Sequence, residues 1–432
     1  MKSLSCRDRL EHALDRIADP KGEGARACLT VYTDAARAAA DAAEARAAHG
    51  VSLGPLDGAI VSIKDLFDVA GEPTRAGSKV LADEAAAAEA DAPIVRRLRA
   101  GGAVIVAKTN MTEFAFSAVG ANPHFGTPGN PSDRARVPGG SSAGAAVAAA
   151  DGMCEIAIGS DTGGSVRIPA ALCGVVGFKP SKRRVPTEGA FPLSFTLDSV
   201  GPLAGIVADC AKADAVMAGE EYLPLDPVAI AGLRLGVVEG LARERPDDTV
   251  APAFAAAVKR LDGAGARITH EVISLFDDMA AVNGKGGIPP PEACAIHRDR
   301  IKRRGAEIDP NVRLRIERGC AMAAADYIQI LRERERLVRA MDRRLAPLDA
   351  LLLPTTPIVA PTLQHVADTK NFFASHNALI SHTAFGNFFD LCAISLPLSA
   401  ALPVGLMLVA RNGHDHALLR IAAAVESLLA GG

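Results

Sequence analysis

The N-terminal third of the chain alternates helix signals with strand signals, and this alternation constrains the fold more than any other feature. Apolar residues first recur at helical spacing, at Leu10, Ala13, Leu14 and Ile17. An Ala-rich helix over residues 35–49 follows, and Gly50 stops it. After it come a strand-like run over 56–69, a helix over 91–100 and a strand over 103–107. Such alternation is typical of helices that pack on both sides of one sheet. We therefore predict an α/β fold, a central mixed β-sheet covered by helices on both faces.

The remainder of the chain continues this pattern without a linker that would cut it. Strand signals recur over residues 233–238 and 351–353, and helix signals over 251–261 and 416–429. An Arg-rich helical region ends near Leu345. No repeat at a fixed period is visible. We expect a single domain over residues 1–432.

The charge balance argues against a nucleic-acid partner or an acidic membrane surface. Lys and Arg number 47 against 50 Asp and Glu, so the net charge is −3 and no basic excess exists. Only 4% of the residues are aromatic and none is Trp, so Ala, Val, Leu and Ile must fill the core. The partner we expect is a small molecule, and a second copy of the chain stays open as an alternative.

The eight cysteines show no spacing typical of a metal site or a redox motif. No two of them form a CxxC pair, and no spacing typical of a zinc site occurs. They lie at positions 6, 28, 154, 173, 210, 294, 320 and 392. Most have apolar neighbours, which favours reduced, buried thiols in a cytoplasmic protein. The first 19 residues lack the apolar stretch of a signal peptide. We expect neither a metal nor a cofactor.

One uncharged stretch, residues 391–410, is long enough to span a bilayer. Pro397, Pro403 and Gly405 interrupt it and leave two short apolar runs, residues 391–396 and 404–409. Two buried strands with a Pro-marked connection explain this pattern better than a membrane helix.

A Gly-rich turn over residues 159–165 follows a short apolar strand over 154–158. Such a turn cradles phosphate or aims backbone N–H groups at an oxyanion. Phosphate is the weaker interpretation, because neither GxxxxGK[ST] nor GxGxxG occurs between a strand and a helix. In the other interpretation, Ser165 is a nucleophile and the oxyanion donors are the N–H groups of Thr162, Gly163, Gly164 and Ser165.

A serine nucleophile needs a base, and Lys64 is the candidate. It ends the apolar run Ala59-Ile60-Val61-Ser62-Ile63, where burial would lower its pKa. A neutral lysine can accept a proton from a serine. The alternative is that Lys64 marks the edge of a sheet.

Several motifs together resemble the amidase signature family. They are Ile63-Lys64-Asp65, PGGSSAG at residues 138–144, GSDTGGSVRIPA at 159–170, GVVGFKPS at 174–181, DSVGP at 198–202 and PVGL at 403–406. The resemblance is close over about residues 55–205 and weaker over the helical segment at about 205–345. It implies one amidase-signature domain. It also implies a triad of Lys64, Ser141 after a cis peptide bond, and the nucleophile Ser165.

The resemblance also implies supporting residues around this triad. Asp161 and Arg167 would brace the turn, with a plain structural ion pair as an equal alternative, and Ser142 would hydrogen-bond near Lys64. Asp65 is expected to be a solvated or capping carboxylate. Substrate-binding residues are implied at Met111, Tyr327 and Arg334, against the alternatives that Met111 is core and Arg334 belongs to a solvated helix face.

Two features near Ser141 bear on this assignment. Residues 140–144 match G-x-S-x-G, the nucleophile elbow, with Ser142 as the nucleophile. An elbow follows a buried strand, and the polar, Pro-containing residues 130–138 do not form one. After Ser142 this chain has Ala143-Gly144-Ala145, where the family usually has Gly-Gly-Ser.

The function we predict is an amidohydrolase that cleaves a small carboxamide to a carboxylate and ammonia through a Ser acyl-enzyme. One alternative is the glutaminase or A-type subunit of an amidotransferase, which acts with partner subunits. Another is a non-catalytic binding protein that has kept the fold.

Overall fold

The structure is a computed structural model that describes residues 4–226, 228–241, 246–398 and 400–431. Its strands form a single eleven-stranded sheet in the order β1-β3-β2-β4-β6-β5-β10-β11-β9-β7-β8. The strands are β1 Cys28–Val31, β2 Ile60–Lys64, β3 Val104–Thr109, β4 Ile156–Asp161, β5 Val176–Lys179, β6 Ser199–Ala204, β7 Arg234–Glu239, β8 Arg267–Val272, β9 Ala350–Pro354, β10 Cys392–Leu398 and β11 Val404–Ala410.

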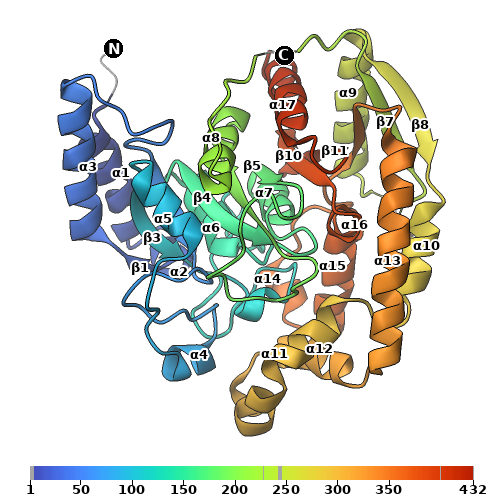
Figure 1. Cartoon of the computed structure of the whole chain (residues 1–432), viewed down its shortest axis with the longest axis horizontal. Coiled ribbons are helices and arrows are strands. Elements are labelled where there is room, and N and C mark those ends of the chain that lie inside the picture. The colour runs from blue at the N-terminus through green and yellow to red at the C-terminus, as the bar shows by residue number, and fades with distance from the viewer. Residues whose placement is uncertain (1–3, 227, 242–245, 399, 432) are drawn as a thin grey trace.

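Helices alternate with these strands over much of the described chain, but only helices occur over residues 275–345 and 363–388 (Figure 1). The first eight are α1 Cys6–Ala18, α2 Gly24–Ala27, α3 Thr33–Ala48, α4 Lys79–Glu84, α5 Pro93–Ala100, α6 Ala143–Ala150, α7 Arg167–Cys173 and α8 Val207–Ala218. The others are α9 Val250–Gly263, α10 Leu275–Asn283, α11 Pro289–Arg304, α12 Pro310–Cys320, α13 Ala324–Leu345, α14 Leu363–Val366, α15 Thr369–Ser381, α16 Ala384–Phe388 and α17 Asp415–Ala430. Two 3₁₀ turns occupy Glu113–Ala115 and Gly305–Glu307.

The sheet is mixed, as predicted. Strand β2 pairs in parallel with β3 and β4, and β7 pairs in parallel with β8 and β9. The pairs β4–β6, β5–β6, β5–β10, β10–β11 and β9–β11 are antiparallel. Strand β2 therefore lies inside the sheet, and Lys64 at its C-terminal end is not an edge residue.

Both faces of the sheet are buried under helices, which confirms the predicted layering. Successive side chains of a strand point to opposite faces, and in β2 Ile60 belongs to one core while Val61 and Ile63 belong to another. The core that contains Ile60 includes residues of α1, α3 and α6. The core that contains Val61 and Ile63 includes residues of α5, α8 and α17 (Figure 1).

Most predicted elements of the N-terminal third are present, but the strand predicted over residues 56–69 is much shorter. Strand β2 covers only Ile60–Lys64. After Lys64 the chain turns, with a hydrogen bond from Phe67 N–H to the Lys64 carbonyl at 3.2 Å. Leu66, Phe67 and Val69 are buried outside any strand, and Phe67 forms only an isolated bridge with Ala190. The apolar run therefore indicates burial and does not indicate the length of the strand.

The uncharged stretch at residues 391–410 forms two strands, as predicted. Strands β10 and β11 pair in antiparallel register, with Cys392 opposite Ala410. None of the helices in the described part of the chain is both long enough and apolar enough to cross a membrane.

The prediction that all eight cysteines are reduced is wrong for two of them. Cys294 on α11 and Cys320 at the end of α12 form a disulfide, with their Cα atoms 5.3 Å apart. The two helices pack directly against each other, and this contact brings together residues that lie 26 positions apart. The other six cysteines are free, and five of these are buried.

Candidate active site

Lys64 lies fully buried at the end of β2, among three serine hydroxyls. Its Nζ is 2.8 Å from Ser141 Oγ, 3.0 Å from Ser142 Oγ and 2.9 Å from Ser160 Oγ. No carboxylate of the described residues lies within ion-pair distance of this amine. A neutral amine has two hydrogens and one lone pair, so three hydroxyls match its capacity and one of them can donate to it.

The surroundings of Lys64 favour this neutral form. Burial lowers the pKa of Lys64 to about 7, although the negative charges of Asp161 and Asp198 oppose the shift. An amine with this pKa is deprotonated in a large fraction of molecules near neutral pH, and can then act as a base.

Ser141 is presented to Lys64 by the loop that precedes α6. The Gly140–Ser141 peptide bond is cis, as the family resemblance implies. Gly140 N–H donates to the Ala118 carbonyl at 2.8 Å, and the Ser141 carbonyl accepts from Thr112 N–H at 3.1 Å. A Cβ on Gly140 would lie 2.7 Å from Gly120 N, so only glycine fits there.

Ser165 lies in the turn between β4 and α7, beside the Ser141 loop. Its carbonyl accepts a hydrogen bond from Ser142 N–H at 3.3 Å, which joins the two serine-bearing segments directly. The Ser165 side chain is on a residue only 8% exposed. The structure thus brings together the segments of all three predicted triad residues.

Three of the four predicted oxyanion donors in this turn are unpaired. Within the described residues, the N–H groups of Thr162, Gly163 and Ser165 donate no hydrogen bond. The Gly164 N–H, which we also predicted to be a donor, is taken by Asp161 Oδ1 at 2.8 Å. Unpaired N–H groups beside a serine hydroxyl are the arrangement that stabilises a tetrahedral oxyanion.

A buried ion pair holds this turn in place. Arg167 donates to both carboxylate oxygens of Asp161, from Nε at 3.0 Å and from Nη2 at 2.8 Å. Asp161 also accepts from Gly164 and Val166 N–H, and both charged side chains are fully buried. Burial opposes ionisation of Asp161, but Arg167 outweighs it and holds the pKa of that carboxyl well below its usual range.

The C-terminal part of the chain closes this network. Asn387 Oδ1 accepts from Arg167 Nη2 at 2.8 Å, and Asn387 Nδ2 donates to Asp161 Oδ1 at 2.9 Å. The Thr383 hydroxyl donates to the Gly163 carbonyl at 2.6 Å. Sequence reasoning missed Asn387 and Thr383, because nothing local to residues 383–387 shows that they lie beside residues 161–167.

Ser160 was also missed, although it lies inside the predicted turn. Its hydroxyl is the third partner of the Lys64 amine. Strand pairing could have indicated it, because alternate residues of a strand share a face and β4 lies in parallel beside β2.

A cavity of about 290 Å³ adjoins the turn. Its polar and acidic lining residues are Ser160, Thr162, Thr187, Glu188, Asp198 and Ser199. Its other lining residues are mostly apolar, including Leu66, Phe191, Leu193 and Phe195. The Thr162 hydroxyl donates to Asp198 Oδ1 at 2.5 Å, and the Asp198 carbonyl accepts from Lys182 Nζ at 2.6 Å. A space of this size fits a small molecule.

The three predicted substrate-binding side chains do not gather at this cavity. Met111 is buried in the hydrophobic core. The Tyr327 hydroxyl donates to Glu292, and Arg334 is ion-paired with Asp390. Each side chain therefore has a structural partner, and Arg334, whose side chain is only 12% exposed, does not belong to a solvated helix face.

Of the two predictions for Asp65, the solvated carboxylate is wrong, because this side chain is fully buried. Its Oδ2 accepts a hydrogen bond from Gly77 N–H at 3.4 Å, just before α4. Lys108 Nζ lies 3.6 Å and Arg75 Nε 3.5 Å from its Oδ1. Burial raises the pKa of Asp65, against the effect of these two cations.

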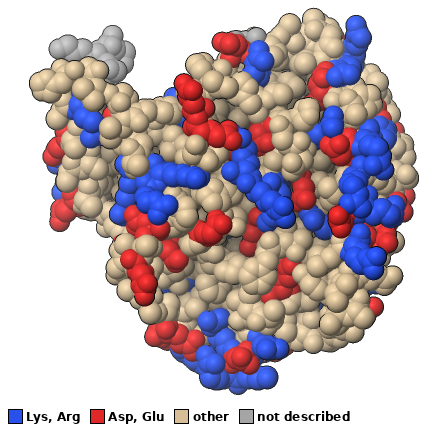
Figure 2. Space-filling view, in the orientation of Figure 1, with Lys and Arg blue, Asp and Glu red and all other residues tan. Residues whose placement is uncertain are grey.

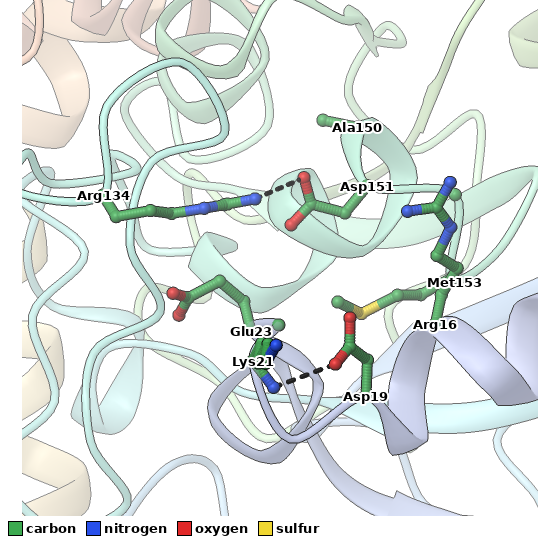
Figure 3. Close-up of a pocket in the computed structure, with 10 residues that line it drawn as sticks. Arg16, Asp19, Lys21, Glu23, Arg134, Ala150, Asp151 and Met153 are labelled. Atoms are coloured by element: carbon green, nitrogen blue, oxygen red, sulfur yellow. Dashed lines mark hydrogen bonds and ion pairs between the residues drawn. The ribbon is translucent and has the colours of Figure 1, made fainter.

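A larger pocket of about 500 Å³ lies away from the serines (Figure 3). Its charged walls carry both signs, and Arg134 forms an ion pair with Asp151 at 2.9 Å. The visible face of the molecule likewise mixes basic and acidic side chains (Figure 2). No member of the Lys64 cluster lines this pocket.

These features define an α/β protein with a buried lysine–serine cluster beside a small cavity. Comparison with known proteins gives the family. The model of a family described as Amidase matches residues 8–419, and the chain belongs to the amidase family. It is therefore a hydrolase that acts on C–N amide bonds.

Individual relatives show how far the similarity extends. The 2-amino-5-chloromuconic acid deaminase of Comamonas testosteroni is 36% identical over 404 residues, 92% of this chain and 87% of that protein. The A-type subunit of the glutamyl-tRNA(Gln) amidotransferase of Anaeromyxobacter dehalogenans (strain 2CP-C) is 41% identical over 306 residues, 68% of this chain and 61% of that protein. A solved structure described as an amidase superposes with a TM-score of 0.88 at 35% identity, and covers 99% of this chain and 96% of its own.

Proposed function

We propose that this chain hydrolyses a small carboxamide to a carboxylate and ammonia, with Ser165 as nucleophile, Ser141 as proton relay and Lys64 as base. The observation that carries the proposal is the 2.8 Å contact between the buried Lys64 amine and Ser141 Oγ. A lysine with a pKa lowered to about 7 by burial needs no histidine to activate a serine.

The reaction begins when Ser165 Oγ attacks the amide carbonyl carbon. Its proton passes to Ser141 Oγ, whose own proton passes to the lone pair of Lys64. The carbonyl oxygen becomes an oxyanion that the N–H groups of Thr162, Gly163 and Ser165 stabilise. Losing one such donor costs other enzymes about 2.7–4 kcal/mol.

Collapse of the tetrahedral intermediate breaks the C–N bond and leaves the acyl group on Ser165. Ser141 gives its proton to the leaving nitrogen and is reprotonated from the Lys64 ammonium, so ammonia departs. A water molecule then attacks the acyl-enzyme and loses a proton through the same relay. The carboxylate leaves and Ser165 regains its hydroxyl.

The substrate class follows in part from the cavity beside the turn. Its volume of about 290 Å³ and mostly apolar wall suit a small organic amide. The relative from Comamonas testosteroni is named for an acid, 2-amino-5-chloromuconic acid, so amides that carry a carboxylate belong in any substrate screen.

The test is an ammonia-release screen over aliphatic, aryl, ureido and amino-acid amides with the wild type and alanine variants. Ser165→Ala is expected to lose at least about 10³-fold in kcat with the fold retained, because no nucleophile remains. Lys64→Ala is expected to be severely impaired and Ser141→Ala to fall between them. Ser132→Ala, a serine of the preceding loop outside the Lys64 cluster, is the matched control. Wild-type rates in Ser165→Ala would reject the assignment.

A second candidate function is the glutaminase subunit of an amidotransferase. It is favoured by the 41% identity to the A-type subunit of a glutamyl-tRNA(Gln) amidotransferase. Release of ammonia from glutamine only in the presence of partner subunits would select this function. A non-catalytic protein would show neither activity nor labelling of Ser165 by a fluorophosphonate.

A further inference from the structure

One wall of the cavity beside the oxyanion turn is a short loop, residues 193–198, which we call the wall loop. Three of its residues line the cavity: Leu193, Phe195 and Asp198. Ser194 and Thr196 lie between them in the sequence and contact Glu292 on α11. The wall loop therefore has the cavity on one side and a carboxylate on the other.

The side chain of Glu292 is buried and accepts four hydrogen bonds. Its Oε2 accepts from the Ser194 hydroxyl and from Thr196 N–H, the latter at 3.2 Å. Its Oε1 accepts from the Thr196 hydroxyl and from the Tyr327 hydroxyl of α13. Burial and the hydrogen bond to Glu292 raise the pKa of Tyr327 to about 12, so this phenol keeps the proton that it donates. Glu292 thus joins two helices to the wall loop.

Other contacts hold the tip of the wall loop, residues 194–196, only weakly. The Phe195 side chain is 62% exposed, so it does not anchor the tip in a hydrophobic core. The Phe195 carbonyl accepts a long hydrogen bond from Lys182 Nζ, at 3.3 Å. Leu197 is buried in the core, but it lies beyond the tip. The hydrogen bonds to Glu292 are therefore the main tie between the tip and the rest of the protein.

Glu292 itself is held in place by the packing of α11. It lies in the first turn of this helix, and two residues later Cys294 forms the disulfide with Cys320 of α12. Helices α11 and α12 pack directly against each other. A carboxylate on an anchored helix can fix a loop, because its own position does not depend on that loop.

The wall loop also reaches the oxyanion turn. Asp198 Oδ2 accepts from Leu193 N–H at 2.9 Å and from Ser194 N–H at 3.0 Å. The other carboxylate oxygen of Asp198 accepts from the Thr162 hydroxyl at 2.5 Å. Holding the tip of the loop therefore fixes the space between the loop and the turn that carries Ser165.

We propose that Glu292 is a positioning residue that sets the size of the amide that the site accepts, by holding the tip of the wall loop against the cavity. The inference rests on the proposed function, because it concerns the selectivity of the same site. With the tip held, the cavity of about 290 Å³ leaves room for a small amide. With the tip released, Leu193 and Phe195 move, so a small amide loses apolar contacts and a longer amide gains room.

The variants follow from the hydrogen bonds of Glu292. Glu292→Ala removes all four. Glu292→Gln is expected to keep the tie, because the amide oxygen accepts from Thr196 N–H while the amide NH₂ donates to hydroxyls, which also accept. Tyr327→Phe removes one bond of the four and keeps the ring, so a smaller effect in the same direction is expected. Asp299→Ala is the matched control, because Asp299 is an exposed carboxylate of the same helix.

Hydrogen exchange of the full chain, followed by mass spectrometry, tests whether Glu292 holds the loop. The peptide that covers residues 193–198 is expected to exchange about 10-fold faster or more in Glu292→Ala, and at about the wild-type rate in Glu292→Gln and Asp299→Ala. A peptide from β11 reports on the rest of the fold, and its exchange is expected to stay unchanged. If it also becomes faster in Glu292→Ala, Tyr327→Phe decides alone. Unchanged exchange of the wall loop in Tyr327→Phe and in a folded Glu292→Ala overturns the proposal.

Kinetics with butyramide and hexanamide test the effect on selectivity. Glu292→Ala is expected to raise kcat/KM for hexanamide relative to butyramide by about 10-fold or more. The change is expected chiefly in the KM for butyramide, with a smaller change in its kcat, because Glu292 does not line the cavity. The wild-type ratio is expected in Glu292→Gln and Asp299→Ala. An unchanged ratio in Glu292→Ala, or the same shift in Glu292→Gln, overturns the proposal.

A binding measurement separates this proposal from the proposed function. Calorimetry with butyramide and hexanamide is carried out on Ser165→Ala and on Ser165→Ala/Glu292→Ala. A shift of about 10-fold or more in the ratio of affinities toward hexanamide supports the positioning role even if neither amide is hydrolysed. An unchanged ratio, or no binding of either amide to Ser165→Ala, overturns it even if the amidase activity stands.

Discussion

The buried pair of Asp161 and Arg167 offers a quantitative test of how the oxyanion turn is held. Asp161 accepts from Arg167 Nε and Nη2, from Gly164 and Val166 N–H, and from Asn387 Nδ2. Asp161→Ala removes all of these acceptors at once and leaves a fully buried guanidinium without a carboxylate. Breaking a buried pair in this way costs about 3–5 kcal/mol of stability.

The assay is urea unfolding at pH 7, followed by circular dichroism, for Asp161→Ala, Arg167→Met and the double variant. We expect each single variant to lose about 3 kcal/mol or more. The double variant is expected to lose much less than the sum, because neither charge is then left alone. The control is the exposed Arg336–Glu333 pair of α13. Replacing either partner by alanine is expected to lower the free energy of unfolding by less than about 1 kcal/mol.

The same pair predicts how stability depends on pH. The pKa of Asp161 is depressed in the folded chain, so its contribution is present above the unfolded value of about 3.9 and is lost as pH falls through the folded value. The double variant should therefore lose less stability between pH 5 and the acid range than the wild type. A loss below about 1 kcal/mol in Asp161→Ala, or strict additivity in the double variant, would refute this account of the turn.

Two further predictions concern the turn and the disulfide. Gly164→Ala is expected to lower the unfolding free energy by about 1–3 kcal/mol and also to lower kcat. The reason is that φ at Gly164 is +133° and an added Cβ would overlap Thr383 Oγ1. Urea unfolding and ammonia release measure the two effects. Gly152→Ala, at φ +71° with open space around it, is the control and should keep kcat. Cys294→Ser/Cys320→Ser is expected to lower the unfolding free energy by about 3 kcal/mol, given the 26-residue separation. An unchanged urea midpoint would contradict it.

The sequence predicts the architecture well where local pattern and burial agree. The alternation of helix and strand signals gives the mixed sheet with two helical layers, and Pro403 lies between β10 and β11 as a breaker should. Pro397 and Gly405 do not end a strand, because they lie inside β10 and β11 and pair with each other. It overestimates β2, because Leu66 and Phe67 are apolar for burial in a loop. Hydrophobicity reports the burial of a residue and does not by itself report strand pairing.

At the candidate site, the sequence predicts the residues that lie inside contiguous motifs and misses those that arrive from elsewhere. Lys64, Ser141 and Ser165 stand in such motifs. Asn387 reaches Asp161 across 226 positions, so only tertiary packing shows this contact. The pairing of Arg334 with Asp390 is likewise invisible in the sequence.

The most direct test of the central claim is the pH dependence of covalent labelling by a fluorophosphonate, with the modified residue identified by mass spectrometry. We expect modification at Ser165, at a rate that rises with pH to a plateau with its midpoint near the Lys64 pKa of about 7, because only the neutral amine can accept the relayed proton. Lys64→Met is expected to label slowly and without this midpoint. Labelling at another serine, or a Ser165 rate in Lys64→Met equal to that of the wild type, would contradict the account.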